Sequence, residues 1–174
     1  IHFESIASIS PPQKIATSQM INKTCDFVSH DVLDMMENMN IENRYSVVDN
    51  YVDYLAGECE RKLITDVNVL AVQSIESCLE GAKSSLNLGL LITITNTAAR
   101  PLPCMAYELI AMTSPELIPR DINSINMQNQ GCSVLVKAFD VAYCYLKTNP
   151  DKQVLITVSE AHTAMIPPYL RHHK

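Results

Sequence analysis

The stretch over residues 125–146, INMQNQGCSVLVKAFDVAYCYL, decides the fold because it joins two patterns around a single residue. Residues 122–129, INSINMQN, have the pattern of a strand, and residues 133–148 are apolar at nearly every helical position. The spacing therefore predicts that Cys132 lies where a strand ends and a helix begins. A helix that is apolar almost all round is expected to be buried on most sides.

Strand and helix patterns alternate from residue 67 onward. The expected segments are a helix over 67–86, a strand over 90–97, a helix over 104–112, a strand over 122–129, a helix over 133–148 and a strand over 153–160. This alternation predicts an α/β fold with a parallel or mixed sheet and helices on its faces. In such sheets the chemistry collects where strands end. The strand ends carry Asn96 and Thr97, Cys132, and Ser159 and Glu160.

The N-terminal third has a less regular pattern. Residues 2–10, HFESIASIS, are predicted to form a short strand that ends at Pro11 and Pro12. Residues 19–39 follow helical spacing, and residues 41–65 are predicted to be a polar connection with at most a helical turn.

Length and composition exclude several classes of protein. The 174 residues are predicted to form one domain over residues 1–174, and 47% hydrophobic against 18% charged residues suits a heavily buried chain. The net charge of −6 and the scattering of 13 Lys and Arg argue against a nucleic-acid surface. No run is long and apolar enough for a membrane helix, and the first residues do not resemble a secretory signal. A cytoplasmic protein is expected.

The six cysteines are Cys25, Cys59, Cys78, Cys104, Cys132 and Cys144. They form no CxxC pair and the histidines stand at no ligand-like spacing to them, so we expect neither a metal site nor disulfides. Most are expected to be small buried hydrophobes. Cys132 is the exception, because the positive end of a helix dipole and unpaired N–H groups stabilise a thiolate. The alternative is that Gly131 and Cys132 merely allow tight packing of strand on helix.

Residues 125–168 resemble the nucleophile region of thiolase-fold condensing enzymes, most closely type III polyketide synthases of the chalcone synthase type. The strand, Gly-Cys turn, buried helix, Asn-containing turn and strand ending in Ser-Glu carry the resemblance. Residues 94–109, ITNTAARPLPCMAYEL, resemble the family's strand, Thr-containing turn, proline and helix, and 8–19 and 41–49 resemble its N-terminal elements. The resemblance implies the N-terminal half of a thiolase-like αβαβα layered fold, with a mixed sheet and a buried nucleophile helix.

The resemblance also implies roles for individual residues. Cys132 matches the nucleophile that takes an acyl group from coenzyme A as a thioester. Thr97 and Leu102 match positions that line the active-site cavity, and Leu102 stands near a position exchanged across the family's dimer. Glu160, His162 and Met165 match the segment that shapes the cavity and limits product length.

Two of these assignments have ordinary alternatives. Arg44 matches the arginine of the Ile-x-x-Arg element near the acyl-donor entrance, but it could equally form a surface ion pair. His162 stands where the family often has a small hydroxyl residue. It is either a titratable group in the pocket or a solvated loop histidine.

The chain departs from the family in two respects. The nucleophile is usually followed by small residues, whereas residues 133–139 are bulky, so a narrower cavity is expected. The family's catalytic His and Asn lie in a C-terminal half that has no counterpart in this sequence. His172 and His173 fit no matching motif, and an exposed tail is expected there. We therefore expect exposed apolar surface and a partner, either a second copy or a chain that supplies the His and Asn.

The resemblance implies an acyltransferase that forms C–C bonds by decarboxylative Claisen condensation. Its substrates would be an acyl-CoA starter and malonyl-CoA, with no cofactor beyond these coenzyme A thioesters, and no nucleic acid or membrane as partner. The alternatives are a fatty-acid-type 3-ketoacyl synthase and a non-catalytic thiolase-fold subunit that pairs with an active partner.

Overall fold

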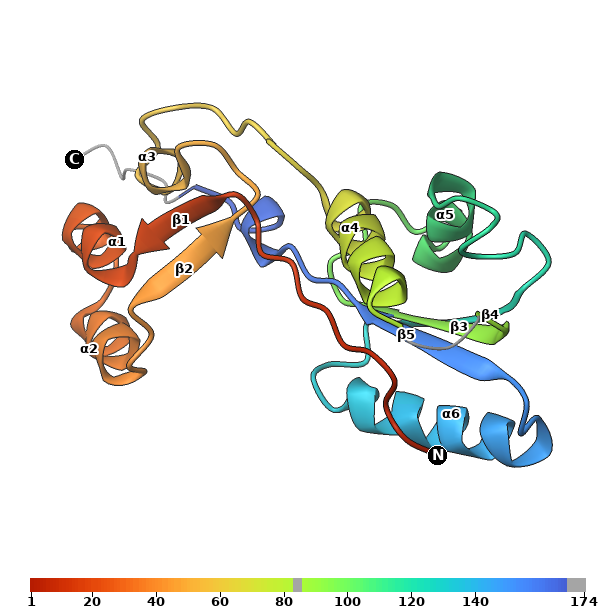
Figure 1. The fold of residues 1–174 in the computed structure, drawn as a ribbon. Coiled ribbons are helices and arrows are strands. Elements are labelled where there is room, and N and C mark those ends of the chain that lie inside the picture. Colours follow the sequence, from red (N-terminus) through yellow and green to blue (C-terminus); the bar gives the residue numbers. More distant parts are fainter. Residues whose placement is uncertain (83–85, 169–174) are drawn as a thin grey trace. The chain divides into compact units, whose positions relative to one another are not determined.

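The computed structural model describes residues 1–82 and 86–168 (Figure 1). His172 and His173 lie outside the described residues. The contacts divide the chain into two compact units, Ile1–Ile9 with Val67–Glu160, and Ser10–Asp66 with Ala161–Lys174. The predicted single domain stays a prediction, and each unit is described by itself. Within the described part of the chain, no helix is long and apolar enough to cross a membrane.

Three parallel strands form the sheet of the first unit. The central strand is β3 (Leu88–Thr95), with β4 (Asn123–Gln128) on one side and β5 (Gln153–Val158) on the other. β3 is an unbroken apolar and β-branched run because both of its faces are covered. The three strands lie within two residues of their predicted positions, and among the described residues this sheet is parallel rather than mixed. All three carboxyl ends therefore meet at one edge.

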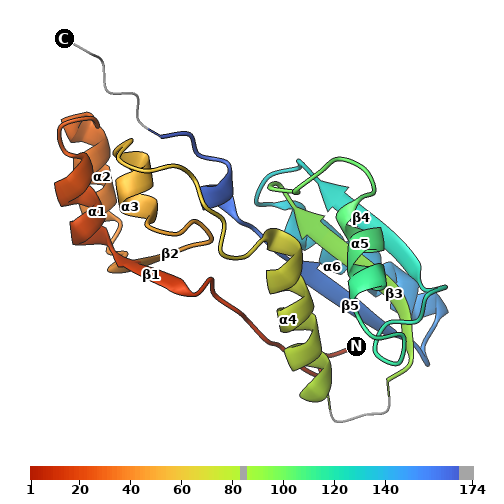
Figure 2. The same ribbon diagram turned by 90° about the horizontal axis from the view of Figure 1, so that it is seen from above.

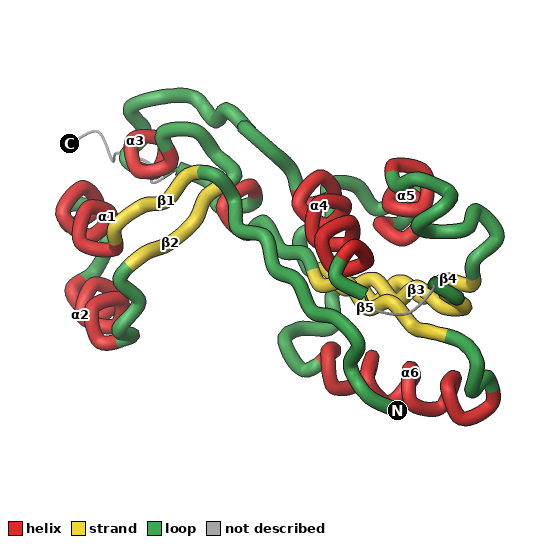
Figure 3. The backbone as a smooth tube through the Cα atoms, viewed as in Figure 1, coloured by secondary structure: helices red, strands yellow, loops and turns green. Residues whose placement is uncertain are grey.

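Helices cover both faces of this sheet. α4 (Val67–Glu80) and α5 (Met105–Met112) lie on one face, and α6 (Val134–Thr148) lies on the other (Figures 1 and 3). The predicted order of helices and strands from residue 67 onward is confirmed. The first unit is thus a three-layered α/β arrangement. The chain leaves the sheet toward α5 and α6 from the same edge, where β3 and β4 end.

α6 packs onto the sheet through one narrow face. The core between them consists of Leu90, Ile92, Ile94, Met127, Val134, Ala138 and Ala142. Val134, Ala138 and Ala142 follow each other at four-residue spacing, which places them on a single side of the helix. Their small side chains let the helix approach β3 closely.

The opposite face of α6 is exposed and carries three apolar side chains beside the charged side chains of Asp140 and Lys147. Val136, Phe139 and Tyr143 are 64%, 40% and 52% exposed. The expectation that this helix is buried on most sides is therefore wrong for this chain, because the sheet covers one side of it. The first residues of the chain cover a small part of the other side, where the rings of Phe3 and Phe139 meet edge to face with their centroids 5.7 Å apart.

The second unit is built on a two-stranded antiparallel sheet. β1 (Gln13–Ala16) pairs with β2 (Asn43–Ser46), and α1 (Thr17–Thr24), α2 (His30–Asn38) and α3 (Tyr51–Leu55) accompany them (Figure 2).

An exposed ion pair connects two parts of this unit. Lys23 Nζ lies 2.6 Å from a carboxylate oxygen of Glu58, and this hydrogen bond raises the pKa of the ammonium.

Three expectations for the N-terminal third are wrong. Residues 2–10 form no strand, and the strand begins only after the two prolines, at Gln13. The single helix expected over 19–39 is two helices, because the backbone of Ser29 is extended (φ −64°, ψ 150°) and α2 begins after it. The connection expected over 41–65 contains β2, a strand that exists because it pairs with β1.

Candidate active site

Cys132 lies in the turn that joins β4 to α6. Asn129 and Gly131 have φ values of 58° and 74°, so the chain passes twice through the left-handed region between the strand and the helix. This geometry turns the chain sharply and leaves the side chain of Cys132 exposed. A Cβ at Gly131 would also meet no atom within 4 Å, so this structure does not favour the alternative that Gly131 and Cys132 merely allow tight packing of strand on helix.

The helix starts slightly later than predicted. Ser133 is the N-cap residue of α6 and its hydroxyl makes no capping hydrogen bond. Cys132 thus precedes the N-cap instead of lying in the first helical turn. It still adjoins the N-terminus of a helix of 15 residues whose first turn has no side-chain cap. The positive end of the helix dipole is favourable to a thiolate at this place.

Two hydrogen bonds tie this turn to the end of β3. The backbone N–H of Asn129 donates to the Thr95 carbonyl at 3.3 Å. The backbone N–H of Gly131 donates to Oδ1 of Asn96 at 3.1 Å. The residue before Cys132 is therefore held by a side chain of the neighbouring strand end.

A carboxylate completes the arrangement. Oε1 of Glu160 accepts hydrogen bonds from the backbone N–H and from Nδ2 of Asn96, both at 2.8 Å. Oε2 of Glu160 accepts a hydrogen bond from Oγ1 of Thr97 at 2.9 Å. The structure thus brings together Thr97 and Glu160 and connects them through Asn96 to the Cys132 turn.

The sequence pattern places Asn96 and Ser159 at strand ends, but neither was given a role in the predicted site. Asn96 directly follows β3 and Ser159 directly follows β5. Ser159 has a different role, because its hydroxyl donates to the Val67 carbonyl at 2.7 Å and so fastens the end of β5 to α4. Of the strand-end residues without an assigned role, only Asn96 contacts the cysteine turn among the described contacts.

Leu102 lies in the loop between β3 and α5. Its side chain is 81% exposed, and the peptide bond to Pro103 is cis. Its predicted place near a dimer interface stays a prediction.

His162 and Met165 belong to the second unit. His162 begins a short 3-10 helix, η1 (His162–Ala164), and both side chains are exposed, Met165 by 60%. This segment is fastened within its own unit, since Tyr54 Oη donates to the Ile166 carbonyl at 2.9 Å. Exposure favours the solvated alternative for His162 in this chain.

Arg44 lies on β2 in the second unit. Its Nε and Nη2 atoms are buried and have no hydrogen-bond partner among the described residues. No ion pair to Arg44 occurs in the described part of the chain either, which disfavours the surface ion pair as its role. Buried guanidinium nitrogens without an acceptor are costly, so an anionic group that reached these two atoms of the half-buried Arg44 would be stabilising.

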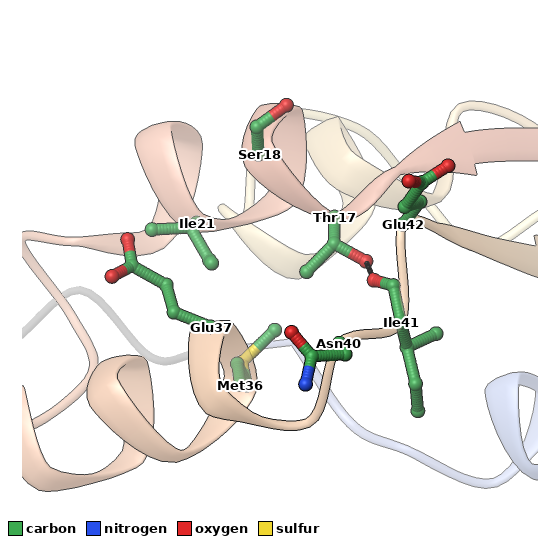
Figure 4. Close-up of a pocket in the computed structure, with 8 residues that line it drawn as sticks. All are labelled: Thr17, Ser18, Ile21, Met36, Glu37, Asn40, Ile41 and Glu42. Carbon is green, nitrogen blue, oxygen red and sulfur yellow. Dashed lines mark hydrogen bonds between the residues drawn. The ribbon is translucent and has the colours of Figure 1, made fainter.

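A hollow of about 360 Å³ in the second unit does not coincide with these residues (Figure 4). It is lined by Thr17, Ser18, Ile21, Met36, Glu37, Asn40, Ile41 and Glu42. Oγ1 of Thr17 donates a hydrogen bond to the Ile41 carbonyl at its wall. None of the predicted site residues lines this hollow, and we assign it no part in the site.

The expectation that most cysteines are buried is wrong. Cys25, Cys59, Cys132 and Cys144 are exposed, and Cys78 and Cys104 are half-buried. Among the described residues, no group of three or more His, Cys, Asp or Glu side chains could hold a metal ion.

No protein-family model matches the chain. No curated protein matches it. Solved structures match the chain. A mutant of CsyB has a TM-score of 0.73 at 16% identity, and the match covers 94% of this chain and 47% of the CsyB chain. The chain has the thiolase fold. The tetronic acid condensing enzyme AbyA1 has a TM-score of 0.68 at 16% identity, with 98% of this chain and 47% of its own covered.

A third likeness is to 3-oxoacyl-[acyl-carrier-protein] synthase III from Aquifex aeolicus VF5. Its TM-score is 0.67 at 18% identity, covering 92% of this chain and 45% of its own. The thiolase fold predicted from residues 125–168 is thus confirmed, and the structures that share it are condensing enzymes. The chain spans about half the length of these structures. At such low identity the likeness establishes the fold and leaves the residue roles as predictions.

Proposed function

We propose that this chain is part of a condensing acyltransferase in which Cys132 accepts an acyl group. The observation that carries the proposal is the exposed thiol of Cys132, set beside an uncapped helix start at the carboxyl edge of a parallel sheet. Reactive groups in α/β sheets collect at this edge. The condensing enzymes that share the fold make an acyl-transfer role the natural one for such a thiol.

The proposed reaction has two stages. The Cys132 thiolate attacks the carbonyl of an acyl-CoA, and the coenzyme A thiolate leaves, so that the acyl group is held as a thioester. Malonyl-CoA then loses CO₂, and the resulting carbanion attacks the Cys132 thioester. The new C–C bond forms as the thiolate of Cys132 departs. No cofactor beyond the coenzyme A thioesters takes part.

The catalytic His and Asn of the proposal come from residues outside this sequence. They would stabilise the carbanion and the oxyanion that develop in each stage. The exposed apolar face of α6, with Val136, Phe139 and Tyr143, offers a surface on which such a polypeptide could pack. Leu102 would contact a second copy across a dimer.

The remaining predicted residues have supporting roles in the proposal. Thr97 and Glu160 would line the cavity that holds the acyl group. His162 and Met165 would have the role that the resemblance gives them, which is to limit the product length. Arg44 would receive an anionic part of the acyl donor, which gives its buried guanidinium an acceptor.

The experiment is a test of covalent acylation. The native polypeptide that contains this sequence is incubated with a labelled acyl-CoA, and the acylated peptide is identified by mass spectrometry. We expect the label on Cys132 and none in Cys132→Ala. Cys144→Ala is the matched control, since Cys144 is also exposed and lies on α6, the helix that follows Cys132. Labelling that survives Cys132→Ala would contradict the proposal, and so would a wild-type protein without label, which favours a non-catalytic subunit.

A fatty-acid-type 3-ketoacyl synthase is the second candidate. The likeness to a 3-oxoacyl-[acyl-carrier-protein] synthase III favours it. The two candidates differ in extender and product. Repeated extension from malonyl-CoA to a polyketide supports the first, whereas a single extension with a malonyl-carrier protein to a β-ketoacyl product supports the second.

A further inference from the structure

The side chain of Asn96 contacts two groups that follow different strands of the sheet. Nδ2 donates to Glu160 at the end of β5, and Oδ1 accepts from the backbone N–H of Gly131 after β4. Asn96 itself follows the central strand, β3. One amide therefore joins the carboxyl ends of all three parallel strands.

The orientation of this amide is fixed by its partners. An ionised carboxylate only accepts hydrogen bonds, so Glu160 must face the NH₂ end of Asn96. A backbone N–H only donates, so Gly131 must face the oxygen. Both demands are met by one orientation, with distances of 2.8 and 3.1 Å. Glu160 is itself held by the backbone N–H of Asn96 and the hydroxyl of Thr97.

The backbone of the Cys132 turn depends on this hydrogen bond for its position. Asn129 and Gly131 both have positive φ, and the backbone of Gly131 is exposed. A Cβ at Gly131 would meet no atom within 4 Å, so packing does not hold the residue in place. Its position depends on hydrogen bonds, of which the one to Asn96 is nearest to Cys132 in the chain.

We propose that Asn96 is a positioning residue that sets the geometry of the Cys132 turn, and that Glu160 acts through Asn96 by fixing which end of its amide faces the turn. The inference rests on the proposed function, because it concerns the residue that places the nucleophile. Neither side chain needs to touch the acyl group for this role. A shift of the thiol by a fraction of its own size is enough to slow an attack that depends on orientation.

The test uses Asn96→Ala and Asn96→Asp in the native polypeptide, with two readouts. The first is amide hydrogen exchange of Gly131 by NMR, and the second is the rate of Cys132 acylation by a labelled acyl-CoA. In Asn96→Ala we expect Gly131 to exchange about five- to tenfold faster. We expect acylation to slow by between about tenfold and a hundredfold.

Asn96→Asp distinguishes a positioning role from a merely structural one through the pH dependence of the acylation rate. It keeps an acceptor for Gly131 but places a second carboxylate against Glu160. Two such groups share a proton at low pH, which restores a donor between them. The acylation rate of this variant, taken as a ratio to wild type at each pH, should rise as the pH falls. A ratio that is flat with pH would overturn the role of Glu160.

Asn87→Ala is the matched control for folding. Asn87 also donates its side-chain amide, to the Asp151 carbonyl at 2.8 Å, but at the opposite edge of the same sheet. It should leave Gly131 exchange and acylation unchanged. If Asn96→Ala left Gly131 exchange unchanged, the inference alone would be overturned. It would also be overturned if the wild type was acylated at Cys132 and Asn96→Ala was acylated at the same rate. A wild type that is never acylated at Cys132 would instead overturn the proposed function and this role with it.

Discussion

Cys132 differs from the other exposed cysteines in what surrounds its thiol. The thiols of Cys25 and Cys59 each donate to a backbone carbonyl, of Asn22 and Asn50, at 3.2 and 4.0 Å. Cys144 lies within α6, where the backbone N–H groups are used by the helix. Cys132 alone of the four adjoins a helix start. Exposure is thus common among these cysteines, and the local backbone sets Cys132 apart.

Gly131 offers the first prediction at this scale. Replacement by alanine adds a Cβ that meets no neighbour, so any loss comes from the positive φ of 74°. Gly131→Ala should lower the free energy of unfolding by about 1 kcal/mol, and Gly131→Asn by less, because asparagine tolerates this region better. Urea unfolding of both variants measures the difference. An asparagine variant as destabilised as the alanine variant would show that the side chain, not φ, is responsible.

Arg44 gives a prediction of opposite sign. Arg44→Met keeps most of the apolar stem and removes two buried nitrogen atoms, Nε and Nη2, that have no acceptor among the described residues. The free energy of unfolding should stay the same or rise, by up to about 1–3 kcal/mol. Arg61→Met is the control, since Arg61 donates to the Ala164 carbonyl at 2.6 Å and its loss should destabilise. Clear destabilisation of Arg44→Met in urea unfolding would mean that the guanidinium is satisfied.

At the scale of elements, local patterns were sufficient from residue 67 onward. β3 and β5 are apolar runs, and α5 begins within one residue of its expected start, because each of these patterns is read from neighbouring residues. β2 could not be predicted in this way. Its four residues are a strand because Arg44 and Asn43 pair with Ile15 and Ala16, almost thirty positions earlier in the chain.

In the candidate site, too, local patterns predicted one part, and contacts between distant residues determine the other. The strand-end rule placed Thr97 and Glu160 at one edge, and they hydrogen-bond there. The link through Asn96 could not be predicted, because it depends on the left-handed turn at Gly131, which brings a backbone N–H back toward β3. A pattern of residue types contains no information on where that N–H points.

The packing of α6 on β3 gives a prediction for this element pair. Ile92 is fully buried in the core between them. Ile92→Ala should lower the free energy of unfolding by about 2–5 kcal/mol, through lost apolar burial and the cavity left behind. Val136→Ala, on the exposed face of α6, should change it by less than about 0.5 kcal/mol. Equal losses in urea unfolding would contradict the assignment of the two faces.

At the scale of the whole molecule, the exposed face of α6 and the edge strand β4 are the main features to explain. Val136, Phe139 and Tyr143 share one face of the helix, and Ile125 on β4 is 37% exposed. The outer side of β4 pairs with no other described strand. Open apolar faces and open strand edges are typical of surfaces that another chain covers. The similar structures are about twice as long as this chain.

Val136→Lys tests whether α6 carries the surface for the polypeptide that supplies the His and Asn. The variant should unfold like the wild type, because Val136 is 64% exposed in this chain. Its affinity for a separately produced polypeptide corresponding to the other half of a condensing enzyme should fall at least about tenfold, since a charge would have to be buried. Tyr107→Lys is the control, because Tyr107 is 63% exposed on α5, across the sheet. Analytical ultracentrifugation measures both affinities, and an equal loss in the two variants would place the contact elsewhere than on α6.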